Sequence, residues 1–382
     1  MNQVYFDNAA TTKLREEVIE EMHQLMRTHF GNASSTHAFG REAKSILETC
    51  RKQIANLIGA KSSEIIFTSG GTESDNLVLQ RSITDLGVSH IITSKIEHHA
   101  VLHTVERLVE EGKCTAEYVT VLPNGQIDYN HLETLLAKTN EKCLVSLMHI
   151  NNEIGCINNI EQIGTICRKH EAYFHTDAVQ SVGHFSLNLN EMPLDFLAAS
   201  AHKFHGPKGV GFAYINKSNA LKSLIVGGEQ ERGCRAGTEA IHNIVGMAKA
   251  LELACYKLDS DKYHIINLKS HFVDRLKSEI PNIEFNANSD SIETNTYTLV
   301  NLRLPMEASK SALLLFQLDL KGIACSKGSA CQSGSDKGSH VLAEILNDEE
   351  RSKPSIRFSF SIYNTLEEVD FVVNTLKEFC IN

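Results

Sequence analysis

The feature that most constrains the fold is an alternation of apolar, strand-like runs with segments of helical periodicity between residues 65 and 215. Residues 100–111 and 160–170 carry apolar side chains at helical spacing, whereas residues 144–149 and 196–200 are short apolar runs typical of buried strands. Such alternation is typical of a doubly wound, mainly parallel sheet. We therefore predict an α/β fold whose functional groups lie at the carboxyl ends of the strands.

A second set of elements follows the turn-rich residues 227–237. The pattern predicts one long helix from residue 239 to about residue 280. The segments after it are predicted as strands at residues 297–304, 322–325 and 356–362 and as helices at residues 310–320 and 366–379. This arrangement indicates a smaller α+β domain after about residue 260.

Composition limits the classes of function. The chain has 382 residues, and its 37 Lys and Arg against 47 Asp and Glu give a net charge of −10. A broad basic surface for nucleic acid is therefore not indicated. The first residues lack a basic and apolar leader, and no apolar run reaches the roughly 18 residues of a membrane span. We expect a soluble cytoplasmic protein that binds neither nucleic acid nor a membrane.

Lys203 lies between the predicted strand 196–200 and the glycine-rich residues 205–209. A single lysine is usually a solvated surface charge, but here an acid converges on the same end of the sheet, because Asp177 follows the apolar residues 172–174. An enzyme that uses pyridoxal 5'-phosphate (PLP) needs a lysine that forms a Schiff base and an acid that keeps the pyridine nitrogen protonated. Lys203 and Asp177 can supply these two groups.

A phosphate would fit between a predicted strand at residues 64–68 and a predicted helix that begins near Thr72, because residues 69–71 form a glycine turn. The backbone N–H groups of such a turn and of a helix N-terminus favour an anion. By itself the pattern is equally compatible with ordinary helix capping, and Glu73 fits a capping role.

Nine short motifs together resemble the cysteine desulfurases of the class-V aminotransferase family, in the group with the longer catalytic loop that serves nitrogenase and general iron–sulfur cluster assembly. They occur in order at residues 6–12, 68–76, 97–98, 151–155, 175–180, 200–209, 235–238, 328–331 and 356–359. The resemblance implies PLP-dependent transferase fold type I. It places a large PLP-binding domain at residues 14–258 and a small domain at residues 1–13 and 259–382, with the catalytic cysteine loop at about residues 325–340. It also implies a homodimer.

The resemblance implies roles for the matching residues. Lys203 would be the Schiff-base lysine and the catalytic acid/base, and His98 would stack on the cofactor ring. Thr238 would reach the phosphate from the other subunit, and Arg357 would hold the substrate carboxylate, for which its planar fork is suited. The implied cofactor-binding set is Gly71, Thr72, His98, Asp177, Gln180, Ser200, His202, Lys203 and Thr238, and the implied substrate-binding pair is Asn152 and Arg357.

Ten cysteines are scattered along the chain without a paired motif, which favours reduced thiols. Most are expected to be small buried residues, and Cys325 is interpreted in this way. Cys331 differs because residues 326–338 are small and polar, a composition for which we expect a mobile loop. The resemblance implies that Cys331 takes sulfur from L-cysteine as a persulfide, releases L-alanine, and passes the sulfur to an iron–sulfur scaffold protein or a thiolation acceptor.

Other interpretations remain open at this point. His99 and His103 have the spacing of a metal pair, but Glu97 precedes both, so the usual zinc-protease order is absent and no metal is expected. One alternative is a different PLP enzyme on the same fold, such as an aminotransferase or a selenocysteine lyase. An aminotransferase would have no use for a mobile thiol. A non-catalytic PLP-binding protein is disfavoured because Lys203, Asp177, Arg357 and Cys331 are all present.

Overall fold

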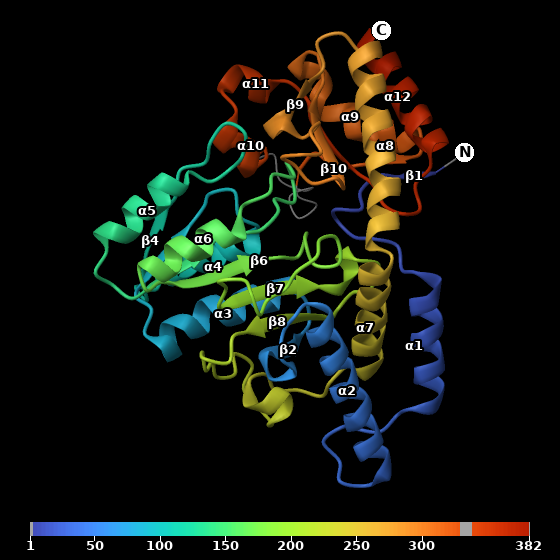
Figure 1. Cartoon of the computed structure of the whole chain (residues 1–382). Helices are drawn as coiled ribbons and strands as arrows, with labels where there is room; N and C mark the ends of the chain where they lie inside the picture. Colours follow the sequence, from blue (N-terminus) through green and yellow to red (C-terminus); the bar gives the residue numbers. More distant parts are fainter. Residues whose placement is uncertain (1–2, 329–337, 382) are drawn as a thin grey trace.

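The central sheet has seven strands in the spatial order β2-β8-β7-β6-β5-β3-β4, and it is mainly parallel (Figure 1). The computed structural model describes residues 3–328 and 338–381. Only β8 runs against its neighbours, β7 and β2, within this sheet. The strands are β2 (Ile65–Thr68), β3 (His90–Thr93), β4 (Thr115–Tyr118), β5 (Cys143–Ser146), β6 (Tyr173–Asp177), β7 (Phe196–Ser200) and β8 (Gly211–Ile215). The predicted α/β architecture is confirmed.

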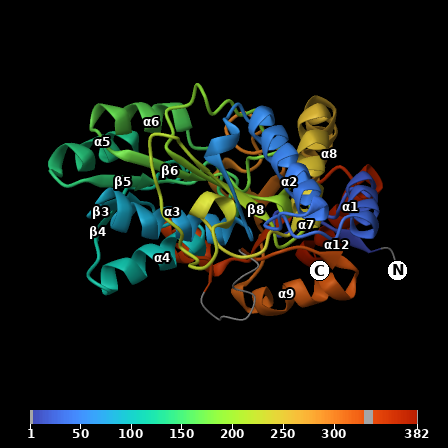
Figure 2. The same cartoon turned by 90° about the horizontal axis from the view of Figure 1, so that it is seen from below.

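Helices cover both faces of this sheet (Figure 2). One face packs against α2 (Ala38–Leu57), α5 (Tyr129–Lys138), α6 (Ile160–Lys169) and α7 (Ile241–Tyr256), with α1 (Glu16–Thr28) outside α7. The other face packs against α3 (Gly71–Leu86) and α4 (His99–Glu110). Two separate apolar cores result, as the strand and helix patterns require of a doubly wound sheet. In the described part of the chain, no helix combines the length and the apolar character needed to cross a bilayer.

Most of the remaining elements surround a third core, whereas Val341 and Leu342 belong to a smaller fourth cluster with Ile96, Ile154, Cys156 and Ala287. An antiparallel sheet has the order β12-β10-β9, and β1 pairs with β11 in parallel. The strands are β1 (Val4–Tyr5), β9 (Glu284–Phe285), β10 (Leu299–Arg303), β11 (Ile323–Ala324) and β12 (Ser355–Ser359), and the helices are α8 (Leu258–Glu279), α9 (Ala308–Leu320), α10 (His340–Ile345), α11 (Asp348–Ser352) and α12 (Leu366–Ile381). The short 3-10 helices are η1 (Ser62–Glu64), η2 (Ala201–Lys203), η3 (Gln230–Gly233) and η4 (Asn286–Asn288). Because β1 joins β11, the N-terminal segment belongs with this core, and we propose the domain boundary near residue 258.

The prediction of one long helix over residues 239–280 is wrong. The helix is interrupted at Lys257, with φ −97° and ψ 10°, and continues as α8. The apolar side chains of α7 belong to the core of the central sheet, whereas those of α8 belong to the third core, where α8 packs against α12. The helix is thus divided where its burial changes from one core to the other, and neither Gly nor Pro marks this point in the sequence.

Candidate active site

A cavity of about 210 Å³ opens at the carboxyl ends of β6 and β7, where Asp177 and Ser200 are the last strand residues. This is the edge at which a doubly wound sheet binds its ligands. Ten residues predicted from the sequence line the cavity: Gly71, Thr72, His98, Asn152, Asp177, Gln180, Ser200, His202, Lys203 and Arg357. Ala9, Ala10, Asp75, Met148 and Val179 complete the lining. The fold therefore brings together residues from seven separate parts of the sequence.

Lys203 and Asp177 lie in the same cavity. Lys203 ends η2, directly after β7, and its Nζ donates to the main-chain oxygens of Ala9 at 2.6 Å and Ala10 at 2.8 Å. Asp177 is buried, and its Oδ1 accepts the N–H of Val179 at 2.9 Å. Burial raises the pKa of Asp177 to about 6, so a cationic partner would stabilise its charged form. A protonated pyridine nitrogen is such a partner.

The N-terminal segment forms part of the wall beside these residues. Gln180 donates from Nε2 to the Ala9 oxygen at 3.0 Å, and Thr12 donates to the main-chain oxygen of His202 at 3.0 Å. Residues 6–12 are one of the motifs noted in the sequence, but no role was predicted for Ala9 or Ala10. The side chains of these alanines have no polar atoms, so both residues contribute main-chain oxygens to the wall of the cavity.

The start of α3 has the features of an anion site. Gly70 has φ 151°, and a Cβ atom on Gly71 would lie 2.6 Å from Cγ2 of Val179, so a side chain there would close the approach to the helix N-terminus. Glu73 accepts the N–H of Ser69, the residue before the N-cap Gly70, at 2.8 Å. The glycine turn, the helix N-terminus and the cavity-lining hydroxyl residues Thr72 and Ser200 fit a phosphate group.

Two histidines of the cavity are neutral at physiological pH. Burial, followed by the charge of Lys203, lowers the pKa of His98 to about 4, and the same two causes lower the pKa of His202 to about 4. Nδ1 of His98 accepts the N–H of Ala100 at 3.1 Å and caps α4. In the neutral ring the hydrogen therefore lies on Nε2. Such an uncharged imidazole is suited to stack against a cofactor ring.

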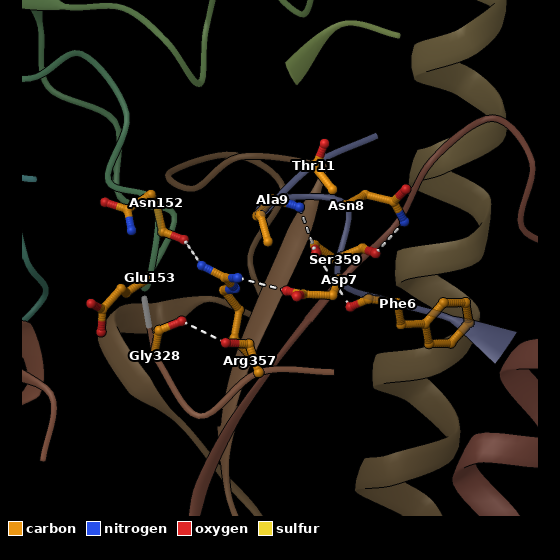
Figure 3. Close-up of polar contacts among 12 residues, drawn as sticks. Phe6, Asp7, Asn8, Ala9, Thr11, Asn152, Glu153, Gly328, Arg357 and Ser359 are labelled. Atoms are coloured by element: carbon orange, nitrogen blue, oxygen red, sulfur yellow. Dashed lines mark hydrogen bonds and ion pairs between the residues drawn. The ribbon is translucent and has the colours of Figure 1, made fainter. Parts of the chain in front are cut away.

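Arg357 is buried on β12 and reaches the cavity beside Asn152 (Figure 3). Its Nη1 donates to the main-chain oxygen of Asn152 and its Nη2 to Oδ1 of Asp7, each at 2.7 Å. The backbone of Arg357 pairs with Ser326, since its N–H donates to the Ser326 oxygen at 2.7 Å. The role of Asp7 was not predicted. Because the ion pair joins residues 350 positions apart, no local pattern could indicate it.

One predicted site residue, Thr238, is exposed and does not line the cavity. Cys331 lies outside the described residues. Cys325 precedes Cys331 in the sequence. Burial raises the pKa of the Cys325 thiol to about 12, which agrees with its interpretation as a small core residue.

The histidine pair of α4 is arranged as a stack. The ring centroids of His99 and His103 lie 4.5 Å apart, and the ring centroid of His340 lies 4.4 Å from that of His99. Within residues 3–328 and 338–381, no group of three or more His, Cys, Asp or Glu side chains has an arrangement that could hold a metal ion.

The mainly parallel sheet with helices on both faces is the α/β fold of the PLP-dependent transferases of fold type I. The family model of the class-V aminotransferases matches residues 4–372. The chain belongs to this family and, within it, to the cysteine desulfurases.

Relatives and solved structures with full-length similarity support this assignment. The cysteine desulfurase IscS of Dictyoglomus turgidum is 42% identical over 98% of this chain and 94% of its own length. The putative cysteine desulfurase IscS 1 of Bacillus subtilis is 42% identical over 97% of this chain and 96% of its own. A NifS-like protein has a TM-score of 0.89 at 36% identity, covering 99% of both chains. A structure described as SspA in complex with cysteine has a TM-score of 0.81 at 30% identity, covering 95% of this chain and all of that one.

Proposed function

We propose that this protein is a PLP-dependent enzyme that converts L-cysteine to L-alanine and transfers the sulfur to Cys331 as a persulfide. From Cys331 the sulfur would pass to an acceptor for iron–sulfur cluster assembly or thiolation. The observation that carries the proposal is the convergence of Lys203, Asp177 and Arg357 on one cavity. Cysteine as the substrate is supported by the relatives named cysteine desulfurase and by the similar protein described in complex with cysteine.

The residues that would hold the cofactor are those that the family resemblance implies and that line the cavity. Lys203 would bind its aldehyde carbon, Asp177 its pyridine nitrogen and Gln180 its ring hydroxyl. His98 would cover the ring face, and the phosphate would bind at the start of α3 with Gly71, Thr72, Ser200 and His202. The chemistry that PLP supplies when bound is the withdrawal of electrons from the bonds at the substrate's Cα.

Within this arrangement, the chain's own groups bind the substrate and move its protons. Arg357, with Asn152, would hold the carboxylate. Lys203 Nζ would remove the proton from Cα. The thiolate of Cys331 would then attack the substrate's sulfur, so that an S–S bond forms and the Cβ–S bond breaks. The electron pair of the broken bond remains on Cβ, which is protonated, Cα regains a proton from Lys203, and alanine is released. The free thiol and L-cysteine thereby become a persulfide and L-alanine.

We propose a homodimer as the functional state. In the single chain Thr238 is exposed and does not line the cavity. A second copy that presented Thr238 would add a hydroxyl donor to the phosphate site.

The direct test is incubation of the PLP-loaded protein with L-cysteine, with alanine and sulfide measured together. K203A and C331A are expected to abolish release of both. Lys208→Ala, in the same glycine-rich turn, and Cys325→Ala, before the same loop, are matched controls that are expected to remain active. Activity toward cysteine that survives C331A would contradict the persulfide step. A loaded protein inert toward cysteine but active toward other amino acids and 2-oxo acids would indicate a different PLP reaction.

A further inference from the structure

A chain of three buried polar side chains lies beneath the cavity, and the proposed reaction does not use it. Asp75 comes from α3, His175 from β6 and Ser146 from β5, and each has a relative exposure of 1% or less. Oδ1 of Asp75 lies 3.4 Å from Nε2 of His175, and Nδ1 of His175 lies 2.9 Å from Oγ of Ser146. Asp75 also lines the cavity, as does Asp177.

The contact between Asp75 and His175 leaves two buried atoms in need of a hydrogen bond. Across residues 3–328 and 338–381, Asp75 Oδ1 and His175 Nε2 are both without a hydrogen-bond partner. Buried polar atoms of this kind are costly, and an approach by about 0.3 Å would bring the pair within ordinary hydrogen-bond distance. One proton shared between the two atoms would satisfy both.

The surrounding charges decide which residue carries that proton. Two further buried carboxyl groups, Asp177 on β6 and Glu97 before α4, act on Asp75. Burial, then Asp177 and then Glu97, raise the pKa of Asp75 well above its usual range. Burial raises the pKa of Glu97 to about 8 and lowers the pKa of His175 to about 3. Burial therefore disfavours charge on each of these groups, and Asp177 is the most acidic of the three carboxyl groups.

We propose that Asp75 is a protonated positioning residue, which donates a hydrogen bond to Nε2 of a neutral His175, whose Nδ1–H donates in turn to Ser146. The consequence is that Asp177, rather than Asp75, presents the negative charge to the cofactor. His175 and Asp177 are two residues apart on β6, so their side chains lie on the same face of the strand. Fixing His175 therefore fixes the surroundings of Asp177. The role in cofactor binding rests on the proposed function, whereas the position of the proton does not.

The first test observes the proton directly. Infrared difference spectra of the purified protein at neutral pH are compared between wild type and D75N, with the carbonyl band of a protonated carboxylic acid as the signal. Glu97→Gln is the matched control, because Glu97 is also expected to contribute such a band. Loss in D75N of a band that persists in E97Q is the expected result. Identical spectra of wild type and D75N in this region would overturn the proposal, whether or not the protein binds PLP.

The second test uses the PLP-loaded protein and follows the visible absorbance of the lysine-bound cofactor against pH. If Asp75 is neutral, D75N replaces one uncharged polar group by another. The midpoint of the absorbance titration should stay within about 0.3 pH units of wild type. If Asp75 were charged, its removal would lower the midpoint by about one unit or more, and this result would overturn the proposal.

Further variants separate positioning from simple structural damage. D75A removes both donor and acceptor, and it is expected to shift the absorbance midpoint that D75N preserves. Ser146→Ala should displace the infrared band of Asp75, because the hydrogen bonds of the chain polarise one another. Equal effects of D75N and D75A on the midpoint would contradict a donor role for Asp75. Failure of the wild type to take up PLP would instead refute the proposed function and leave the infrared result interpretable.

Discussion

The guanidinium of Arg357 is already paired with a carboxylate of its own chain, because its Nη2 lies 2.7 Å from Oδ1 of Asp7. The pair joins the N-terminal segment to β12 (Figure 3). The Arg357 side chain is 1% exposed, so the ion pair offsets the cost of burying its charge. A substrate carboxylate at Arg357 therefore has to share the cation with Asp7.

Substitutions of Asp7 should separate its charge from its hydrogen bond. In D7N the amide oxygen still accepts from Arg357 but no longer neutralises it, so KM for L-cysteine and the inhibition constant of L-alanine should fall by roughly 3- to 10-fold. In D7A the guanidinium also loses its orientation, and KM should rise. Steady-state kinetics with both variants test this. An increase of KM in D7N similar to that in D7A would mean that the charge of Asp7, and not its hydrogen bond, holds Arg357.

Glu97 should make the stability of the protein depend on pH. Burial raises its pKa from 4.5 to about 8, so between these values the unfolded chain releases this proton before the folded chain does. The contribution of Glu97 to stability is therefore fully present below pH 4.5 and is lost as pH rises through 8, at up to about 1.4 kcal/mol per pH unit. E97Q should flatten this decline, because Gln keeps an acceptor for Met148 N and Ser94 Oγ.

Urea midpoints of unfolding measured at intervals from pH 5 to pH 8 provide this test. The control is Glu106→Gln, since Glu106 is exposed on α4. If the profiles of urea midpoint against pH were parallel for E97Q and wild type, Glu97 would ionise normally in the folded protein.

A buried ion pair should carry much of the stability of the segment that leads to Thr238. Arg51 on α2 donates to both carboxylate oxygens of Glu231, at 2.6 and 2.8 Å, and Glu231 also accepts Phe67 N–H at 2.8 Å. Both side chains are 2% exposed. E231A leaves a buried cation unpaired and should lower the free energy of unfolding by about 3–5 kcal/mol.

The comparison for this pair is the other carboxylate bound to Arg51. Glu48 contacts Arg51 at 3.1 Å, but its side chain is 35% exposed. E48Q should cost at most about 1 kcal/mol. Urea denaturation of both variants measures the difference, and equal losses would argue against the importance of burial at Glu231.

Gly71 should be required for cofactor affinity rather than for folding. A Cβ atom at this position would lie 2.6 Å from Cγ2 of Val179, which lines the same cavity. G71A is expected to raise the dissociation constant for PLP about tenfold or more, because the clash displaces the wall of the phosphate site. Titration of the variant with PLP, followed by absorbance, gives this constant.

The clash between a Cβ atom at position 71 and Val179 can also be relieved by shortening the side chain of Val179. V179A removes the Cγ2 atom, so the double variant G71A/V179A should bind PLP more tightly than G71A, while V179A alone remains close to wild type. A double variant no better than G71A would place the defect in the helix N-terminus itself.

Much of the cavity could be predicted because its chemistry lies in short segments at strand ends. Asp177, Ser200 and Lys203 each follow a local apolar run, and the glycine turn before α3 is also a local signal. The contacts that the sequence could not indicate depend on packing between distant elements. Asp7 meets Arg357 because Phe6 and Asp7 pair with Ser359 at the end of β12, and Asp75 meets His175 only because α3 packs on β6. In the same way, the interruption at Lys257 reflects a change of core and no local breaker.

The N-terminal segment also has a consequence for synthesis. Asn8 donates to the main-chain oxygen of Ser359 at 2.8 Å, across 351 positions of sequence, and Lys203 donates to Ala9 across 194. Contacts of such long range can form only after the later partner has left the ribosome. A nascent chain that already contains Lys203 and Asp177 therefore lacks Arg357 in the lining of its cavity until β12 has been made. A cavity in which Arg357 could hold a carboxylate is therefore complete only after β12 has left the ribosome.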